Sequence, residues 1–200
     1  MEEKILFKSI KKISFILLTL ILVITSVVSC GGKADESEIL SAFTELYGKS
    51  VPINEYIFGK GLPYDNPESY KTDELTSPYY VAVSESSPYK TVAEFEVAIL
   101  EVYSKDYYTV SLKQGLFTGY GEKNDQKPRY TEENGVLKID ITKAGLEITG
   151  RFDASKASVK SASSDEAVVR APWRSGETVK EYDLTLIREN GQWRLDTPTY

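Results

Sequence analysis

The side chains best suited to acid–base chemistry lie in the second half of this 200-residue chain: Asp140, Arg170, Tyr182 and Asp183. Two carboxylates that share an apolar pocket have different pKa values, so one can act as an acid and the other as a base. Asp140, Arg170 and Asp183, however, fall on the polar phase of their predicted strands, where cross-strand charge pairs on a solvated face are expected. The chain has no histidine, which excludes Ser-His-Asp triads and imidazole zinc sites. These residues favour a binding protein and leave an Asp/Tyr-dependent enzyme as the weakest alternative.

Two clusters of side-chain oxygens could suit Ca²⁺. They are Asp65, Asn66 and Glu68, and Glu122, Asn124 and Asp125. Neither cluster has the ligand spacing of an EF-hand loop, and Asp and Asn are also common turn formers. We therefore predict no metal and no cofactor.

The single cysteine, Cys30, follows a stretch that is typical of an export signal. Lysines lie within residues 1–12, and residues 13–28 are almost all apolar, a run too short for a membrane-spanning helix. The sequence Val27-Val28-Ser29-Cys30 resembles a bacterial lipobox. The resemblance implies cleavage before Cys30, a lipid on its sulfur and acylation of the new N-terminus. The alternative is an uncleaved signal anchor with an incidental cysteine.

We therefore expect a signal peptide over residues 1–29, a lipidated tether over residues 30–36 and a single domain over residues 37–200. A lipid anchor at Cys30 would hold this domain on the extracytoplasmic face of a bacterial cell membrane, since several acyl chains together give stable anchoring.

The charge after residue 29 argues against nucleic-acid partners. Residues 1–29 hold four of the 24 basic and two of the 30 acidic residues, so their removal would leave a net charge of −8. Such a surface is repelled by nucleic acid and by anionic lipid. All 14 tyrosines lie after residue 29, and tyrosine is common both at binding surfaces and in sheets. The candidate binding residues are Tyr64, Asp65, Tyr70, Tyr120, Arg170, Trp173 and Tyr182.

Helices are predicted in the first part of the domain. We expect one over residues 37–47, capped by Asp35 or Ser37 and ended by Gly48, and a short helical piece over residues 53–58. Residues 59–78 are rich in turn formers and predict a long loop, followed by a strand over residues 79–83.

The strongest helix signal is the capping box formed by Thr91 and Glu94. A further helical piece is expected over residues 106–114, with Asp106 as its cap and Gly115 as its stop.

From about residue 128 the apolar period changes to two, which indicates strands. Asn134-Gly135 is a strong hairpin signal between residues 129–133 and 136–141. Further strands are expected over residues 157–161, 167–173, 178–188 and 192–195, with Trp193 in the core. Pro172 predicts an edge strand or a strand end. Helices followed by an antiparallel meander predict an α+β fold, with the helices packed on a curved sheet.

The segment YDLTLIRENGQWRLDTPTY resembles the last two strands of cystatin-like, nuclear-transport-factor-like domains. Over residues 79–196, the order of TVAEFEVAILEVYS, KDYYTVSLKQGLF, Glu133-Asn134-Gly135 and GQWRLD resembles the IseA-type secreted inhibitors of peptidoglycan DL-endopeptidases. This resemblance implies a non-enzymatic, cystatin-like protein that occludes the catalytic cleft of a cell-wall hydrolase. The contact surface would be the acidic, tyrosine-rich loops over residues 59–80 and 118–127. The alternative is a lipoprotein that binds a small molecule or glycan in a cavity of the sheet.

Overall fold

The computed structural model describes residues 34–121 and 126–200. Ala34–Tyr200 forms one compact unit. The predicted signal peptide, the lipobox with Cys30 and the oxygen cluster at residues 122–125 lie outside the described residues. Within the described ranges, no helix is long and apolar enough to cross a membrane.

The first helix is longer than predicted. α2 spans Glu36–Ile57, and Asp35 caps it by accepting the backbone N–H of Ser37 at 2.7 Å. The helix continues through Gly48 and Pro52, so the predicted end at Gly48 is wrong. Glycine and proline both weaken a helix interior. Burial on either side of them outweighs that cost, because the helix buries Ile39, Phe43, Leu46, Tyr47, Ser50, Ile53, Asn54 and Ile57.

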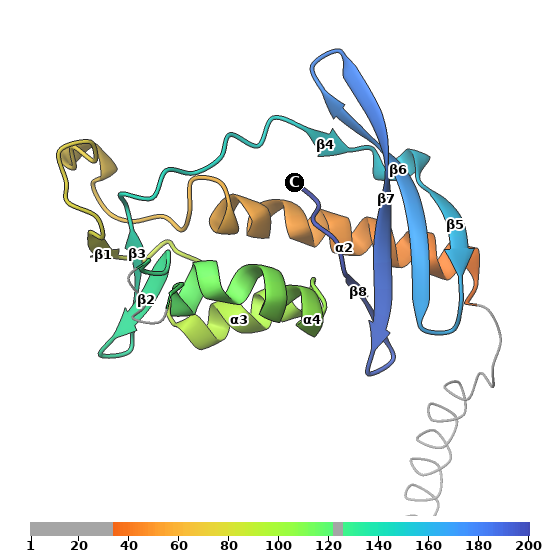
Figure 1. Ribbon diagram of the computed structural model, residues 1–200, viewed down its shortest axis with the longest axis horizontal. Coiled ribbons are helices and arrows are strands. Elements are labelled where there is room, and N and C mark those ends of the chain that lie inside the picture. The colour runs from red at the N-terminus through yellow and green to blue at the C-terminus, as the bar shows by residue number, and fades with distance from the viewer. Residues whose placement is uncertain (1–33, 122–125) are drawn as a thin grey trace, which may run out of the picture. The chain divides into compact units, whose positions relative to one another are not determined.

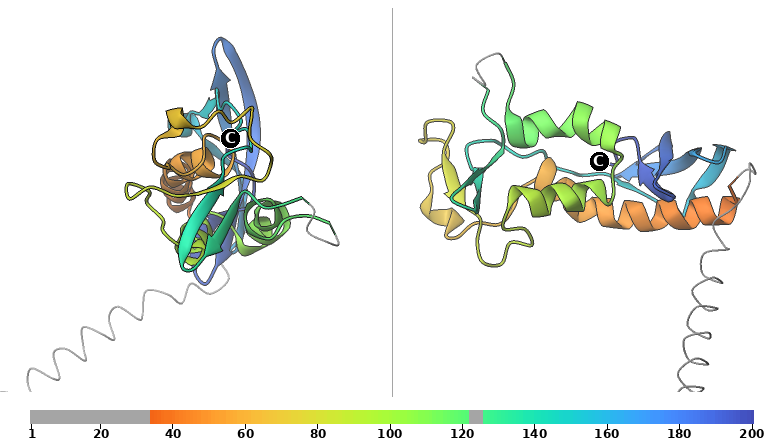
Figure 2. Two further views of the ribbon diagram at one scale, coloured as in Figure 1. Left: turned by 90° about the vertical axis from the view of Figure 1, so that its left-hand side faces the viewer. Right: turned by 90° about the horizontal axis from the view of Figure 1, so that it is seen from below.

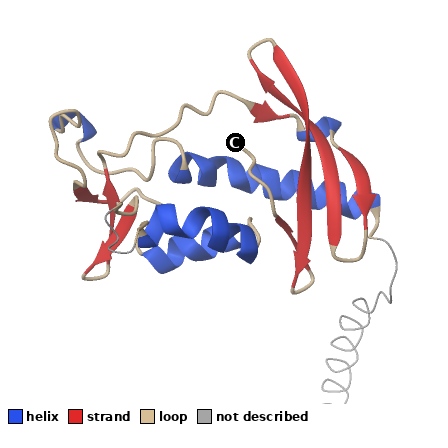
Figure 3. Ribbon diagram, viewed as in Figure 1, coloured by secondary structure: helices blue, strands red, loops and turns tan. Residues whose placement is uncertain are grey.

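α2 packs on a curled antiparallel sheet (Figures 1 and 3). The sheet comprises β4 (Arg151–Phe152), β5 (Ser158–Ala162), β6 (Glu166–Ser175), β7 (Thr178–Glu189) and β8 (Gln192–Leu195). Its order is β4-β6-β7-β8, and β5 also pairs with β6. Alternate residues of these strands are buried in the core: Ala167, Val169, Ala171, Leu184, Leu186, Trp193 and Leu195. The predicted α+β fold, a helix on a curved antiparallel sheet consistent with a cystatin-like fold, is therefore confirmed.

Pro172 lies neither on an edge strand nor at the end of its strand, contrary to the prediction. β6 pairs with β7 along its whole length and with β5 and then β4 on its other side. Pro172 lies where that second partner changes, after the Ser158–Arg170 pair and before the Phe152–Trp173 pair. A residue without an N–H is tolerated at this gap, and the Pro172 carbonyl still accepts the N–H of Asp153 at 2.8 Å.

The remaining strands form a separate three-stranded sheet instead of continuing one meander. It has the order β1-β3-β2, from Tyr80–Ala82, Val136–Asp140 and Tyr130–Glu133. The predicted hairpin at Asn134-Gly135 is confirmed, with φ values of 53° and 76°. Residues 141–150 contain no strand and connect the two sheets. Figures 1 and 2 show the sheets at opposite ends of α2, with the three-stranded sheet near its C-terminal end.

A buried arginine fixes that end of α2. The guanidinium of Arg129, which directly precedes β2, donates to the carbonyls of Ile57 and Gly59 at 3.2 and 2.6 Å. These carbonyls would otherwise lack helical partners, so the contact joins α2 to the three-stranded sheet.

α3 spans Val92–Leu100 and begins as predicted. The Thr91 side chain accepts the N–H of Glu94 at 3.1 Å. The Glu94 carboxylate reaches back to the N–H of Lys90 at 2.7 Å, one residue before the position expected in a capping box.

The next helix differs from its prediction. α4 (Lys105–Tyr107) is capped by the Ser104 hydroxyl, not by Asp106. It continues with π-helical geometry over Tyr108–Leu112 and Gln114–Thr118, passing through Gly115 and ending at Gly119. The wider π turn changes which side chains face inward. It buries Tyr108, Leu112 and Leu116, and leaves Val110 80 % exposed.

Candidate functional site

Three of the tyrosines in the loop between α2 and β1 form a row, which we call the tyrosine row: Tyr64, Tyr70 and Tyr79. The ring centroids of Tyr64 and Tyr70 lie 6.0 Å apart, and those of Tyr70 and Tyr79 lie 6.1 Å apart, with the rings steeply inclined. Tyr64 also forms a β-bridge with Val83, which holds the loop against the three-stranded sheet. Tyr79 is 40 % exposed and its two neighbours are partly exposed. The sequence predicted Tyr64 and Tyr70 as binding residues but missed Tyr79.

The loop that carries the tyrosine row is acidic. Its exposed carboxylates are Asp65, Glu68, Asp73 and Glu74. Among the described residues, only Glu74 of these four forms an ion pair, with Lys71 at 3.1 Å. Asn66 has a φ of 52° and its carbonyl accepts both the N–H and the hydroxyl of Ser69. Residues 66–69 thus form a turn that is closed through the Asn66 backbone carbonyl. Large half-exposed rings surrounded by carboxylates suit contact with a basic surface.

Tyr120 does not join the tyrosine row. It forms a β-bridge with Gln126, and its hydroxyl lies against Gly115, 3.2 Å from where a Cβ would be. The predicted binding residue Tyr120 therefore belongs to the loop that follows the π-helical segment.

Trp173 and Tyr182 meet on the β6–β7 hairpin, in the other sheet. Their ring centroids lie 6.3 Å apart at an interplanar angle of 85°. Tyr182 packs against Phe152, which packs against Tyr47 of α2, so an edge-to-face run of rings leads from the core to the hairpin. Tyr182 is 44 % exposed at the end of this run.

Arg170 lies on the opposite face of the sheet from Tyr182, because neighbouring pairs in a ladder point to opposite sides. Arg170 pairs with Asp183, and the adjacent pair is Ala171 with Tyr182. The guanidinium donates to both Asp183 oxygens at 2.6 and 2.7 Å. Hydrogen bonding to Arg170 lowers the pKa of Asp183, so this carboxylate stays ionised.

Asp140 is buried, so its predicted place on a solvated strand face is wrong. Its Oδ1 accepts the N–H of Tyr79 at 3.0 Å and the N–H and hydroxyl of Thr142 at 3.1 and 2.6 Å. Oδ2 is buried without a protein partner. Asp140 closes the end of the three-stranded sheet, whereas Asp183 lies in the other sheet. The two candidate carboxylates therefore do not converge.

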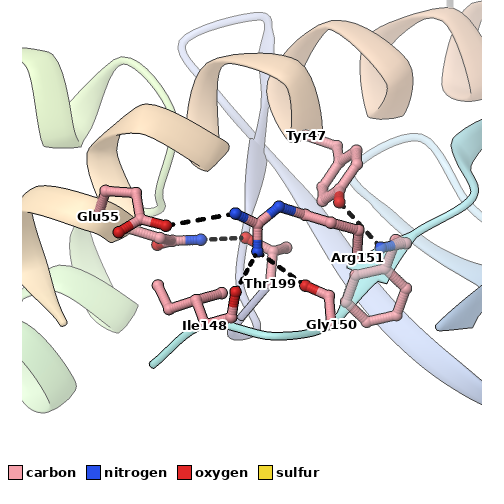
Figure 4. Close-up of polar contacts among 8 residues, drawn as sticks. Tyr47, Glu55, Ile148, Gly150, Arg151 and Thr199 are labelled. Carbon is pink, nitrogen blue, oxygen red and sulfur yellow. Dashed lines mark hydrogen bonds and ion pairs between the residues drawn. The ribbon is translucent and has the colours of Figure 1, made fainter. Parts of the chain in front are cut away.

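Arg151 was not predicted and links β4 to α2 (Figure 4). Its guanidinium donates to Glu55 at 3.3 Å and to the carbonyls of Ile148 and Gly150 at 3.1 and 2.8 Å. The neighbouring N–H of Phe152 donates to the Tyr47 hydroxyl at 2.8 Å. No periodic pattern marks residues 148–152, so the sequence carries no signal for this contact.

A buried polar cluster connects α2, the turn after α3 and the segment after β8. The Tyr103 hydroxyl donates to Asn54 at 2.7 Å and lies 2.8 Å from the Thr199 hydroxyl, which also contacts Ser50 at 2.8 Å. Burial raises the pKa of Tyr103 to about 12, so its hydroxyl stays protonated. These groups satisfy one another and are structural.

The core side of the curled sheet is filled by α2, and its grooves lie at the surface. One groove of about 570 Å³ runs between α2 and β8 and includes Glu38, Glu45 and Trp193 in its lining. Trp193 is buried as predicted; its indole N–H donates to Glu38 at 3.0 Å, and Arg188 lies 4.6 Å from the ring centroid.

Neither a scan against protein-family models nor a search of curated proteins finds a match for this chain. Function is therefore inferred from the site geometry above together with the sequence motifs.

Proposed function

We propose that this chain is a lipoprotein held by Cys30 on the extracytoplasmic face of a bacterial membrane, where it binds and inhibits a cell-wall peptidoglycan hydrolase. The lipobox supports the location, and the cystatin-like curled sheet supports the resemblance to hydrolase inhibitors. Inhibition would be steric: the bound domain occludes the catalytic cleft, and no bond is made or broken.

The tyrosine row is the observation that carries this proposal. Tyrosine gives a large contact area at a small cost in side-chain entropy, which is why it is enriched in binding surfaces. The exposed carboxylates around the row would guide it towards a basic cleft. Asp140 supports the arrangement, since it fixes the backbone of Tyr79 at 3.0 Å.

The test is a hydrolysis assay with a purified peptidoglycan endopeptidase and the full chain in detergent micelles. Tyr64→Ala and Tyr79→Ala should each weaken inhibition about 10-fold or more, as expected for central aromatic contacts. Tyr200→Ala is the matched control, because it removes a similarly exposed ring outside the predicted contact loops, and it should inhibit like the wild type. No change in the hydrolysis rate at micromolar protein would refute the proposal.

The lipid anchor has its own test. Cys30→Ala should release the protein from the membrane or leave the precursor uncleaved, and it should abolish labelling by a fatty-acid analogue. A processed form that stays on the membrane without Cys30 would contradict lipidation.

Trp173 and Tyr182 support a second candidate function, the binding of a glycan. Carbohydrate rings pack on exposed aromatic faces, and this pair lies at the exposed end of a hairpin. If it binds peptidoglycan strands, the full chain should sediment with insoluble peptidoglycan, and Tyr182→Ala should reduce the bound fraction while Tyr64→Ala does not. Equal binding by both variants would exclude this role.

A further inference from the structure

α3 exposes apolar side chains on a face that also carries two glutamates. Of its nine residues, VAEFEVAIL, only Glu94 and Glu96 are polar. Here Phe95 and Ile99 are buried, but Val97 on another face is 58 % exposed.

The exposed face forms a shallow groove of about 580 Å³ that is wide open to solvent. Tyr89, Ala93, Val97 and Ala98 line its apolar part, and Glu94 and Glu101 stand at its two ends. Positions 94, 97, 98 and 101 follow the i, i+3, i+4, i+7 spacing of a single helix face. The Tyr89 wall is firmly held, since its ring stacks on Phe95 with centroids 4.9 Å apart.

Of the two carboxylates at the ends of the groove, Glu94 also accepts the backbone N–H of Lys90 at 2.7 Å, and neither has a cation beside it among the described residues. Neither Glu94 nor Glu101 forms an ion pair within the described ranges. The nearby ammonium of Lys90 is already engaged by the carbonyls of Ser84 and Glu85 at 2.7 and 2.6 Å. At 1.5 Å per residue, the backbone positions of the two glutamates lie about 10 Å apart along the helix axis.

We propose that this α3 groove binds an amphipathic helix of a partner protein, one that carries two basic residues seven positions apart on either side of an apolar residue. The cations would pair with Glu94 and Glu101, and the apolar side chain would cover Val97. A second copy of this chain fits less well, because two α3 helices packed antiparallel about a two-fold axis would bring glutamates against glutamates. This docking surface is separate from the tyrosine row.

The probe is a synthetic helical peptide with lysines seven residues apart that flank a leucine, and the measurement is fluorescence anisotropy with the full chain in detergent micelles. We expect the wild type to bind this peptide and Val97→Lys to abolish binding. Glu101→Gln should weaken binding roughly 3- to 10-fold, and this loss should become smaller at about 0.5 M salt.

Matched controls distinguish binding in the groove from general effects of protein charge and of side-chain exposure. Val110→Lys places the same charge at an even more exposed helical valine. Glu147→Gln removes an exposed carboxylate outside the groove and outside the loop of the tyrosine row. Both variants should bind like the wild type. A peptide with glutamates in place of the lysines should not bind. No binding of the lysine peptide, equal loss in the controls, or a dimer of this chain that Val97→Lys dissociates would each overturn the proposal.

Discussion

The hydroxyl of Tyr103, in the turn after α3, donates to the Asn54 side chain of α2 at 2.7 Å, with both residues buried. Tyr103→Phe removes the donor and leaves the amide oxygen unsatisfied, so the free energy of unfolding should fall by about 1–3 kcal/mol. Chemical denaturation measures this change. Tyr182→Phe is the control, because its exposed hydroxyl forms no hydrogen bond within the described residues, and it should leave stability unchanged. An equal effect of both variants would contradict the structural role of the cluster.

Stability should fall in alkali between about pH 10 and pH 12. Burial raises the pKa of both Tyr103 and Tyr130 to about 12 in the folded state, whereas the value is about 10 in an unfolded chain. The unfolded state therefore loses these protons first. Stability should be constant below about pH 10 and should then decrease by on the order of 3 kcal/mol per tyrosine.

Denaturant titrations at several pH values, with tyrosinate absorbance as a second probe, measure this decrease. Tyr103→Phe should make the pH dependence shallower. A free energy of unfolding that rises above pH 10, or a slope that the variant leaves unchanged, would contradict the assignment.

Gly150 and Gly48 should respond to alanine in opposite directions. A Cβ at Gly150 would collide with the Trp173 indole, whereas one at Gly48 has open space around it. Gly150→Ala should cost about 1–3 kcal/mol by displacing the indole, and Gly48→Ala should stabilise α2 by roughly 0.5–1 kcal/mol. Denaturation gives both values. In a Trp193→Phe background, the emission of Trp173 should shift on Gly150→Ala and stay constant on Gly48→Ala.

Asp140→Ala should destabilise the three-stranded sheet, because the N–H groups of Tyr79 and Thr142 lose their acceptor. The expected cost is about 1–3 kcal/mol. Asp140→Asn keeps one acceptor oxygen and should lower the free energy of unfolding by less. Asp183→Asn, which alters the exposed pair with Arg170, should change the free energy of unfolding little. Hydrogen exchange at Tyr79 would show whether the loss is local, and slow exchange in the alanine variant would contradict it.

The features predicted correctly from the sequence are those fixed by neighbouring residues. Thr91 caps α3 and Asn134-Gly135 turns the β2–β3 hairpin through contacts within a few positions, so their signals are visible in the chain. The end of α2 was missed, because Gly48 and Pro52 disfavour a helix locally while the core packs on both sides of them.

The site residues that were predicted wrongly or missed make contacts with segments far away in the sequence. Asp140 alternates like a surface residue. It is nevertheless buried where β1 pairs with β3, and it accepts the N–H of Tyr79, the residue directly before β1 and 61 positions away in the sequence. The separation of the strands into two sheets likewise arises from pairing between β1 and β3, which no local pattern specifies. Composition alone was enough to predict Tyr64 and Tyr70 as candidate binding residues. Arg151 was missed because its partner Glu55 lies on a helix 96 positions away in the sequence.

The length of α2 also sets the distance between the start of the domain and the loop with the tyrosine row. Its 22 residues correspond to a rod about 33 Å long at 1.5 Å per residue. The chain reaches the domain at Ala34, at one end of this rod, and the loop with the tyrosine row leaves from the other. A protein bound at the row would thus lie about one helix length from Ala34. If the chain is anchored through Cys30 as proposed, the length of α2 would add to the reach of the binding loop.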